Sequence, residues 1–450
     1  MLKSDTKSSI SEQNLQDWKI SGISRKYPTY RNSFVITVQS WLKGKQADDG
    51  AEGLWRIYDT IYDFGEFVKQ HPGGALWLQE TKGTDITEPF ESHHISTIPE
   101  QMLHKFKVRP AAEARNYTLT FDEKGFYKIL KERVRKKLHK IDQSVPRRRT
   151  KLMHLTLLLS TFIFTLVSAM TTSYIVFEML AALALCWLAI ASHNYFHQRD
   201  NWQMYTFNLT LMNCNSWRIS HALSHHVYPN SLFDLEMSLF EPFLCWLPNE
   251  HYASKVQRYT SLLLQPIVYA ATIPVHFIIR LISSLLDTNV IYWHDIIGFI
   301  LPALMWLVSK APLLVVLRQW LFIIMLSSVL FDFIAINAGH HGPKIHHDGD
   351  ANRLDRDWGL YQMDTIVDRG DIKGSPFMVL THFGEHALHH LFPTLDHGVL
   401  PQLYPEFLQT LNEFEVELRE CNHLQHTIAQ NQQLLRTQGN PIAPGSEKNL

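Results

Sequence analysis

The chain has 450 residues, 46% of them hydrophobic and 19% charged, and 42 Lys and Arg against 43 Asp and Glu leave a formal net charge of −1. This length supports several domains and a large core, which excludes a small binding module and a disordered protein. A charge near zero excludes nucleic acid as the main partner. The four cysteines form no CxxC pair, so neither a disulfide framework nor a thiolate metal site is predicted.

The N-terminal part of the chain predicts a flexible tail followed by a small folded domain. Residues 1–27 are polar at first and lack the apolar core of a secretory signal. Residues 54–59 and 61–63 then read as two short strands joined by a turn, and Asp63 can cap a short helix over 64–70. A small α+β domain over residues 28–110 is therefore expected.

A basic linker, residues 111–150, precedes the first long apolar segment. Its cations gather toward its end, and Arg147, Arg148 and Arg149 stand directly before an apolar run over 152–170 that is long enough to cross a bilayer. The positive-inside rule places this linker and the preceding domain in the cytosol. A second apolar stretch over 173–192 returns the chain to that side.

The remainder of the membrane domain is expected within residues 151–410. Apolar stretches cover 262–286, 296–308 and 312–338, but the second is short for a crossing. If histidines before and after this region share one site, an even number of these stretches must cross. We therefore expect four spans in all and one interfacial or re-entrant segment. Residues 411–450 read as a polar, solvated tail.

Histidine is the unusual residue of this chain. There are 25 histidines, and five pairs of them are adjacent in sequence. Random placement at this frequency would give about 1.4 such pairs. The histidines are therefore clustered, and the clusters predict metal or haem ligation.

The first histidine group lies in the small N-terminal domain. His71-Pro72-Gly73-Gly74 ends the short helix, and a second segment from Gly83 to His93-His94 follows. Two histidines separated by a helical excursion can bind one planar iron from opposite faces, which suits electron transfer. These segments resemble a cytochrome b5 domain over residues 28–109. The resemblance implies haem b with His71 and His94 as axial ligands, His93 remaining the alternative to His94, and a cytochrome b5 reductase-type electron donor.

Three further histidine groups adjoin the apolar segments. On a helix, positions i and i+4 share one face, so two such imidazoles can serve one metal centre. Asn337 and His341 also stand four residues apart at the end of the last apolar stretch. The three groups are His193 and His197; His221, His225 and His226; and His386, His389 and His390.

The number of histidines favours a redox metal over a structural one. Ionisable groups at a membrane boundary are costly and need a compensating role. Structural zinc takes four ligands, whereas eight or nine histidines converge here, which is enough for two metals. A haem donor would have no purpose beside redox-inert zinc, so a pair of irons is predicted.

These groups resemble the histidine boxes of the membrane fatty acid desaturase and hydroxylase superfamily over about residues 150–400. The segment His389-His390-Leu391-Phe392-Pro393-Thr394 is close to the third box of the front-end desaturases, which also carry a cytochrome b5 domain. The resemblance implies two non-haem irons, a lipid acyl substrate, and an endoplasmic reticulum membrane with the haem domain and active site in the cytosol. It implies iron ligation by His193, His197, His221, His225, His226, His341, His386, His389 and His390, with Asn337 reaching one iron through water.

The boxes also depart from the front-end pattern. Asn194 stands where these enzymes commonly have Asp, and three residues instead of two separate His221 from His225. His386 replaces a Gln that is typical of front-end enzymes, so the resemblance does not extend to regiochemistry.

The expected fold is a small α+β cytochrome b5-like domain followed by an all-α multi-span membrane domain with a cytosolic helical cap. Two alternatives to a desaturase stay open: a lipid hydroxylase, and a membrane-anchored haem electron carrier without desaturase activity. A zinc hydrolase is disfavoured by the haem domain. His340 is an alternate ligand to its neighbour His341, His382 and His397 are expected to support ligand imidazoles, and His346 and His347 read as solvated loop residues.

Overall fold

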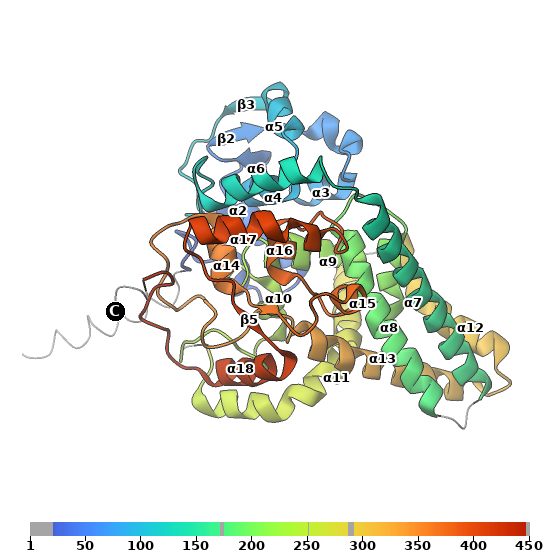
Figure 1. The fold of residues 1–450 in the computed structure, drawn as a ribbon. Helices are drawn as coiled ribbons and strands as arrows, with labels where there is room; N and C mark the ends of the chain where they lie inside the picture. The colour runs from blue at the N-terminus through green and yellow to red at the C-terminus, as the bar shows by residue number, and fades with distance from the viewer. Residues whose placement is uncertain (1–20, 172–174, 251, 287–291, 447–450) are drawn as a thin grey trace, which may run out of the picture.

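The computed structural model describes residues 21–171, 175–250, 252–286 and 292–446. A small domain lies at one end, a cap of short helices occupies the middle, and long apolar helices extend away from the cap (Figure 1). The small domain comes first in the chain, and the cap is built from segments that lie between and after the long helices. The arrangement agrees with the fold class predicted from the sequence.

The small N-terminal domain contains a three-stranded antiparallel sheet. Strand β1 (Trp55–Ile57) pairs with β2 (Thr60–Tyr62), which pairs with β3 (Lys107–Pro110). The short helices η2 (Gly65–Gln70), α3 (Ala75–Glu80), α4 (Thr87–His93), α5 (Ile98–Met102) and η3 (Leu103–Lys105) lie between β2 and β3. Trp55, Ile57, Phe64, Leu78 and Phe90 form its apolar core.

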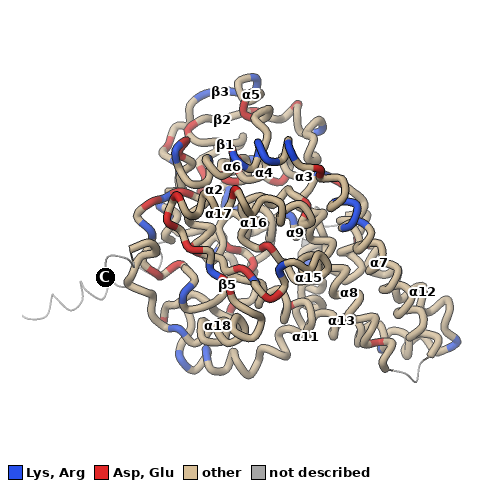
Figure 2. Tube along the Cα trace, viewed as in Figure 1, with Lys and Arg blue, Asp and Glu red and all other residues tan. Residues whose placement is uncertain are grey.

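Four helices are long and apolar enough to cross a membrane, as expected from the sequence. They are α7 (Ser144–Met170), α8 (Ile175–Phe196), α11 (Lys255–Leu286) and α13 (Leu313–Ala335). The short apolar stretch predicted over 296–308 lies between α11 and α13 and forms parts of η7 (Trp293–Phe299) and α12 (Ile300–Val308). Helix α8 packs against both α7 and α13, and α11 packs against α13. Figure 2 shows few charged residues along these helices.

Short helices form the cap between the small domain and the long helices. They include η4 (Gln203–Thr210), α9 (Cys214–Trp217), η5 (Arg218–His225), α10 (Leu235–Phe240), α14 (Trp358–Thr365), α15 (Pro376–Thr381), α16 (His386–Leu391), η8 (Leu400–Leu403) and α17 (Tyr404–Glu413). The linker helix α6 (Phe126–Leu138) packs against α14 and α17. Buried Tyr127 and Trp358 meet at a ring separation of 4.8 Å, which ties the linker to the cap.

The two ends of the described chain pack more closely than their polar composition suggested. Residues 1–20 of the expected tail lie outside the described residues, but Ser21 and Ile23 are buried, and the Ser21 hydroxyl donates to Asp348 at 2.5 Å. Helices η1 (Thr29–Asn32) and α2 (Val38–Asp48) follow this segment. Near the other end, β5 (Glu420–Cys421) pairs with β4 (Asp368–Arg369), and α18 (His423–Leu435) buries Leu434. Polar side chains at both ends find buried partners, which composition alone does not reveal.

Candidate haem cavity and metal centre

A cavity of about 500 Å³ opens in the small domain between His71 and His94. His71 follows η2, and its Nδ1 donates to the Gly74 carbonyl at 2.9 Å; His94 follows α4, and its Nδ1 donates to the Phe90 carbonyl at 3.0 Å. These bonds leave both Nε2 atoms free to bind a metal. The ring centroids are 6.1 Å apart, which leaves room for one metal ion between two imidazoles.

The walls of this cavity suit a flat apolar group. Phe64, Phe67, Phe90 and Phe106 line it, together with aliphatic side chains. Gly73 is required by space, because a Cβ there would lie 2.9 Å from the His71 ring. The residues present therefore fit a haem held between His71 and His94.

His93 also lines the cavity, but its ring has different neighbours. Its Nδ1 lies 3.0 Å from the Pro89 carbonyl, and its ring centroid is 5.6 Å from that of Trp77. Burial lowers the pKa of His93 to about 3 and that of His94 to about 4, so both are neutral near pH 7. Of the two, His94 has its ring close to His71.

Five histidines from three segments form the first metal-competent cluster. Their ligand nitrogens all lie within 4.8 Å of one another, and all five residues are buried. The Nε2 of His193 lies 2.7 Å from that of His221, 3.0 Å from that of His197 and 3.1 Å from that of His389. Crowded lone pairs of this kind are stabilised by a cation among them. The members are His193, His197, His221, His226 and His389.

A second cluster lies directly beside the first. It contains His225, His340 and His390, whose ligand nitrogens also lie within 4.8 Å of one another. The Nε2 of His340 is 3.0 Å from those of His225 and His390 and 2.6 Å from that of His386. The rings of His226 and His390 stack at 3.9 Å, so the clusters are in contact.

The second histidine box lies on a π-helix, where the sequence predicted α-helical spacing. The backbone N–H of His226 donates to the His221 carbonyl at 2.8 Å, which is an i to i+5 bond. The wider turn brings His221 and His226 together, with their Nε2 atoms 3.0 Å apart. His225 instead joins the second cluster. One helix therefore supplies ligands to both clusters.

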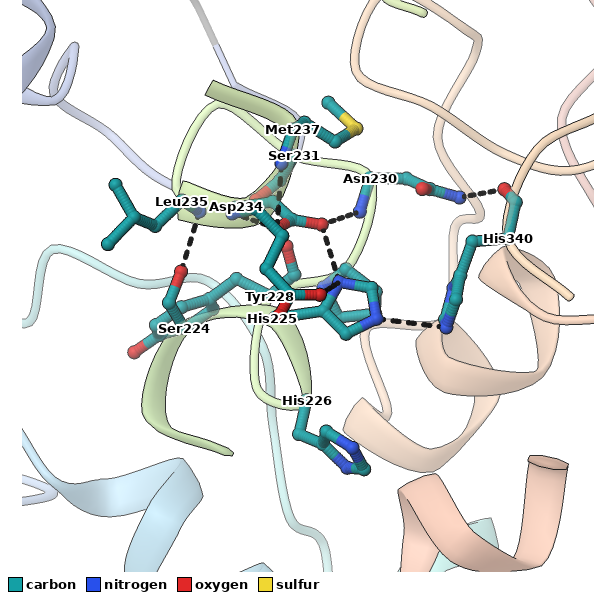
Figure 3. Close-up of polar contacts among 12 residues, drawn as sticks. Ser224, His225, His226, Tyr228, Asn230, Ser231, Asp234, Leu235, Met237 and His340 are labelled. Carbon is teal, nitrogen blue, oxygen red and sulfur yellow. Dashed lines mark hydrogen bonds and ion pairs between the residues drawn. The ribbon is translucent and has the colours of Figure 1, made fainter. Parts of the chain in front are cut away.

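Two carboxylates and one amide contact the Nδ1 atoms of three cluster histidines and so orient their rings. Glu236 accepts from the Nδ1 of His221 at 2.9 Å. Asp234 accepts from the Nδ1 of His225 at 2.9 Å (Figure 3). The Nδ1 of His390 lies 3.2 Å from the Gln362 side-chain oxygen. Burial opposes charge on His225, but Asp234 and Glu236 outweigh it and raise the pKa of His225. Such partners fix the ring orientation and raise ligand basicity.

His341 and Asn337 do not lie where the prediction placed them. The His341 ring stacks on Trp246 at 4.3 Å, and its Nδ1 is 3.3 Å from the Nε2 of His347. Asn337 donates to the Phe333 carbonyl. The helical spacing assumed for residues 337 and 341 fails because α13 ends at Ala335. The structure brings His340, the alternate of the prediction, into the second cluster in place of His341.

The sequence reasoning missed Asp234, Glu236 and Gln362. Asp234 and Glu236 follow the second box within eleven residues, and their carboxylates contact two of its histidines. Asp234 also caps the N-terminus of α10, which places both residues at the start of that helix. The rule that ligand histidines need carboxylate partners could have singled them out. His346 and His347, expected in solvent, are buried.

A cavity of about 90 Å³ lies beside both clusters. His221, His225, His340 and His386 form one wall, and apolar side chains such as Phe331 and Phe383 form others. A neighbouring cavity of about 80 Å³ shares Met212, Trp217, Ser220, Leu239 and His276 with it and reaches Arg280 on α11. The two cavities together run from the clusters toward α11.

Comparisons with known proteins agree with this arrangement. Residues 169–422 match the fatty acid desaturase family, and residues 40–112 match the cytochrome b5-like heme/steroid binding domain. The chain belongs to the fatty acid desaturase family. It carries a cytochrome b5-like haem domain at its N-terminal side, and this combination places it among desaturase-type oxidoreductases.

Two of three relatives match most of the chain. It is 57% identical over 436 residues to the cytochrome b5-related protein of Drosophila melanogaster, which covers 96% of this chain and 100% of that protein. It is 61% identical over 134 residues to the protein of the same name from Drosophila virilis, 30% of this chain and 94% of that one. The probable Delta(5) fatty acid desaturase C of Dictyostelium discoideum is 25% identical over 84% of this chain and 90% of its own length. No solved structure matches the chain.

Proposed function

We propose that the chain is a fatty acyl desaturase whose haem domain delivers electrons to two non-haem irons held by the two histidine clusters. The substrate is an acyl chain of a membrane lipid or acyl thioester. The observation that carries the proposal is the contact of the two clusters through the stacked rings of His226 and His390. Two metals in adjacent sites, next to a haem cavity, match the needs of oxygen-dependent attack on an unactivated C–H bond.

The donor set suits iron. Neutral imidazoles bind Fe, Cu and Zn, and burial lowers the pKa of His226, His340, His389 and His390, which keeps these four rings neutral. His193, His197, His221, His226 and His389 would hold one iron, and His225, His340, His386 and His390 the other. When bound, the iron pair supplies the oxidising power that no side chain has.

The protein's own contribution is orientation and exclusion of water. Glu236 and Asp234 hold His221 and His225 in fixed tautomers. Phe331 and Phe383 keep the cavity beside the clusters apolar on one side. An acyl chain entering from the α11 side would present its reacting carbon to the wall formed by the clusters.

The electrons would enter through the haem domain from a cytochrome b5 reductase-type flavoprotein. The arrangement requires the haem domain, the cap and both clusters on one side of the bilayer. The basic residues 147–149 at the start of α7 favour the cytosolic side, and an endoplasmic reticulum membrane fits the family.

The test is His389→Ala expressed beside the wild type in cells that lack the activity. We expect wild-type cells to gain unsaturated acyl chains and His389→Ala cells to show the profile of the host. Purified wild-type protein should hold about two non-haem irons per haem, and His389→Ala fewer, because His389 reaches the centre of the first cluster.

His382→Ala is the matched control. His382 lies four residues before the third box, and its Nδ1 contacts the Thr381 hydroxyl at 2.9 Å outside both clusters. It should keep the wild-type profile and iron content. Hydroxylated products would indicate a hydroxylase. A protein that holds haem iron alone, with no change in lipids, would overturn the proposal in favour of an electron carrier.

A further inference from the structure

The haem cavity and the five-histidine cluster share a wall. His197 lines the haem cavity, and its Nε2 lies 3.0 Å from that of His193 inside the cluster. Its Nδ1 is buried and has no hydrogen-bond partner among the described residues. Ligand imidazoles normally donate this second nitrogen to an acceptor, and the described residues supply none here. His197 therefore lies between the histidine cluster and the haem cavity.

Arg218 holds His197 in this position. Its Nε donates to the Phe196 carbonyl at 2.8 Å and its Nη2 to the Gln198 carbonyl at 3.0 Å, so it binds the residues on both sides of His197. Arg218 is 1% exposed. A guanidinium with several fixed donors positions a backbone segment more tightly than a single bond does.

The same guanidinium contacts the haem domain. Its central carbon lies 4.8 Å from the Trp77 ring centroid, and Trp77 lines the haem cavity. The ring of His93 lies 5.6 Å from that of Trp77 on the haem side. Stacking of Arg on Trp is favourable and sets the spacing between the two surfaces.

The backbone at Gly74 lies close to the Asp200 side chain, and this approach supports the contact between Arg218 and Trp77. Arg218 pairs with Asp200 at 2.5 Å, and a Cβ at Gly74 would lie 2.5 Å from both Asp200 carboxylate oxygens. Gly74 has a φ of +112°, so glycine is required there for conformation as well as for space. The turn that carries His71 therefore sits directly against the segment that follows the first histidine box.

We propose that Trp77 and Arg218 form the contact through which the haem cavity is electronically coupled to the five-histidine cluster, with His197 as the shared wall. Trp77 and Arg218 are positioning residues in this step. The step moves one electron: ferrous haem becomes ferric, and one ferric non-haem ion becomes ferrous. This inference rests on the proposed function, because it requires iron at the cluster.

The experiment uses full-length protein in detergent with haem and ferric non-haem iron bound. Under anaerobic conditions, a flash-generated flavin semiquinone reduces the haem, and the visible spectrum then follows haem reoxidation. We expect Trp77→Leu to slow this reoxidation about tenfold, because the ring that spaces the two surfaces is lost. Trp77→Phe keeps a ring over Arg218 and should restore most of the rate.

Trp202→Leu is the matched control, since Trp202 is 57% exposed, lies two residues after Asp200 and lines neither cavity. It should leave the rate unchanged. Haem content, midpoint potential and the electron paramagnetic resonance of the bis-histidine haem should stay at wild-type values in Trp77→Leu, which separates coupling from a damaged haem site.

The possible outcomes distinguish a failure of the proposed function from a failure of the coupling through Trp77 and Arg218. No haem reoxidation in wild-type protein that holds both non-haem irons would overturn the proposed function. A wild-type rate in Trp77→Leu with full haem and iron would overturn only this inference. If Trp77→Leu binds no haem, Arg218→Lys decides: it loses the guanidinium stack outside the haem cavity, so a wild-type rate there would also overturn the inference.

Discussion

The neighbouring residues His340 and His341 have opposite surroundings. His340 lies among three ligand nitrogens of the second cluster, whereas His341 stacks on Trp246. The sequence identified eight of the cluster histidines from box spacing, since i and i+4 positions on a helix share a face. It assigned His341 as the ligand and kept His340 as the alternate, because the choice depends on the backbone path after α13 ends at Ala335, which residue spacing does not show.

This difference predicts opposite effects of two adjacent substitutions. His340→Ala should lower non-haem iron from about two to about one per haem, because the second cluster loses the nitrogen that its other members share. His341→Ala should retain both irons and lose only the stack on Trp246. Iron analysis and haem absorbance on the same purified samples check this. If His340→Ala kept both irons and His341→Ala lost one, His341 would be the ligand, as the sequence predicted.

At the scale of an element, the π-helix η5 decides which cluster each ligand joins. An α-helical reading of residues 218–226 pairs His221 with His225, whereas the wider turn pairs His221 with His226. No composition signal marked this turn, since the local sequence fits either helix. The haem segment was more predictable, because His71-Pro72-Gly73-Gly74 ends η2 as its Pro and Gly require.

Ser224 is the residue that ties η5 to the segment carrying the carboxylates. Its hydroxyl donates to the Phe233 carbonyl at 2.8 Å and accepts from the Leu235 N–H at 2.7 Å, and it is fully buried. Ser224→Ala should lower the free energy of unfolding by about 1 to 3 kcal/mol, because two buried backbone groups lose their partner. It should also weaken iron retention, since Asp234 and Glu236 move relative to η5. Thermal unfolding and iron content after chelator dialysis measure both; unchanged values would mean that η5 keeps its geometry without this tie.

At the scale of the molecule, the haem domain is built into the cap. The Tyr30 hydroxyl donates to the Leu232 carbonyl at 2.6 Å, and the Trp41 indole donates to the Phe233 carbonyl at 2.9 Å. Both partners lie just after the second histidine box. Hydropathy predicted the four spans and the order of the domains, but contacts between residues about 200 positions apart leave no local pattern in the sequence.

A buried polar network completes this junction. Lys45 on α2 lies 2.8 Å from Asp49 and donates to the Tyr117 hydroxyl at 2.6 Å. The Tyr117 hydroxyl donates to Asp49 at 2.9 Å, and Tyr117 stacks on Tyr228 at 4.7 Å. Tyr228 follows the second box and donates to Glu88 on the haem-ligand helix α4 at 3.3 Å. The network therefore links both metal-binding parts of the chain.

Loss of Lys45 should destabilise the protein in a pH-dependent way. Burial raises the pKa of Asp49 from 3.8 to about 6 even with Lys45 present, so ionised Asp49 opposes folding as the pH rises through that range. Lys45→Met removes the cation and raises this pKa further. At about pH 8 we expect a loss of about 3 to 5 kcal/mol, because an uncompensated carboxylate stays buried. Toward about pH 5 Asp49 becomes protonated and the deficit shrinks.

Thermal unfolding of the full-length protein in detergent at several pH values measures this deficit. Lys43→Met is the matched control, since Lys43 is exposed and lies two residues earlier on α2, and it should behave as the wild type at every pH. If the loss of unfolding free energy in Lys45→Met stays constant with pH, its cause is the lost packing of the aliphatic part of the Lys45 side chain. A deficit that grows toward acid would show that Lys45 does not stabilise the Asp49 carboxylate, because protonation of Asp49 must relieve the loss of its partner.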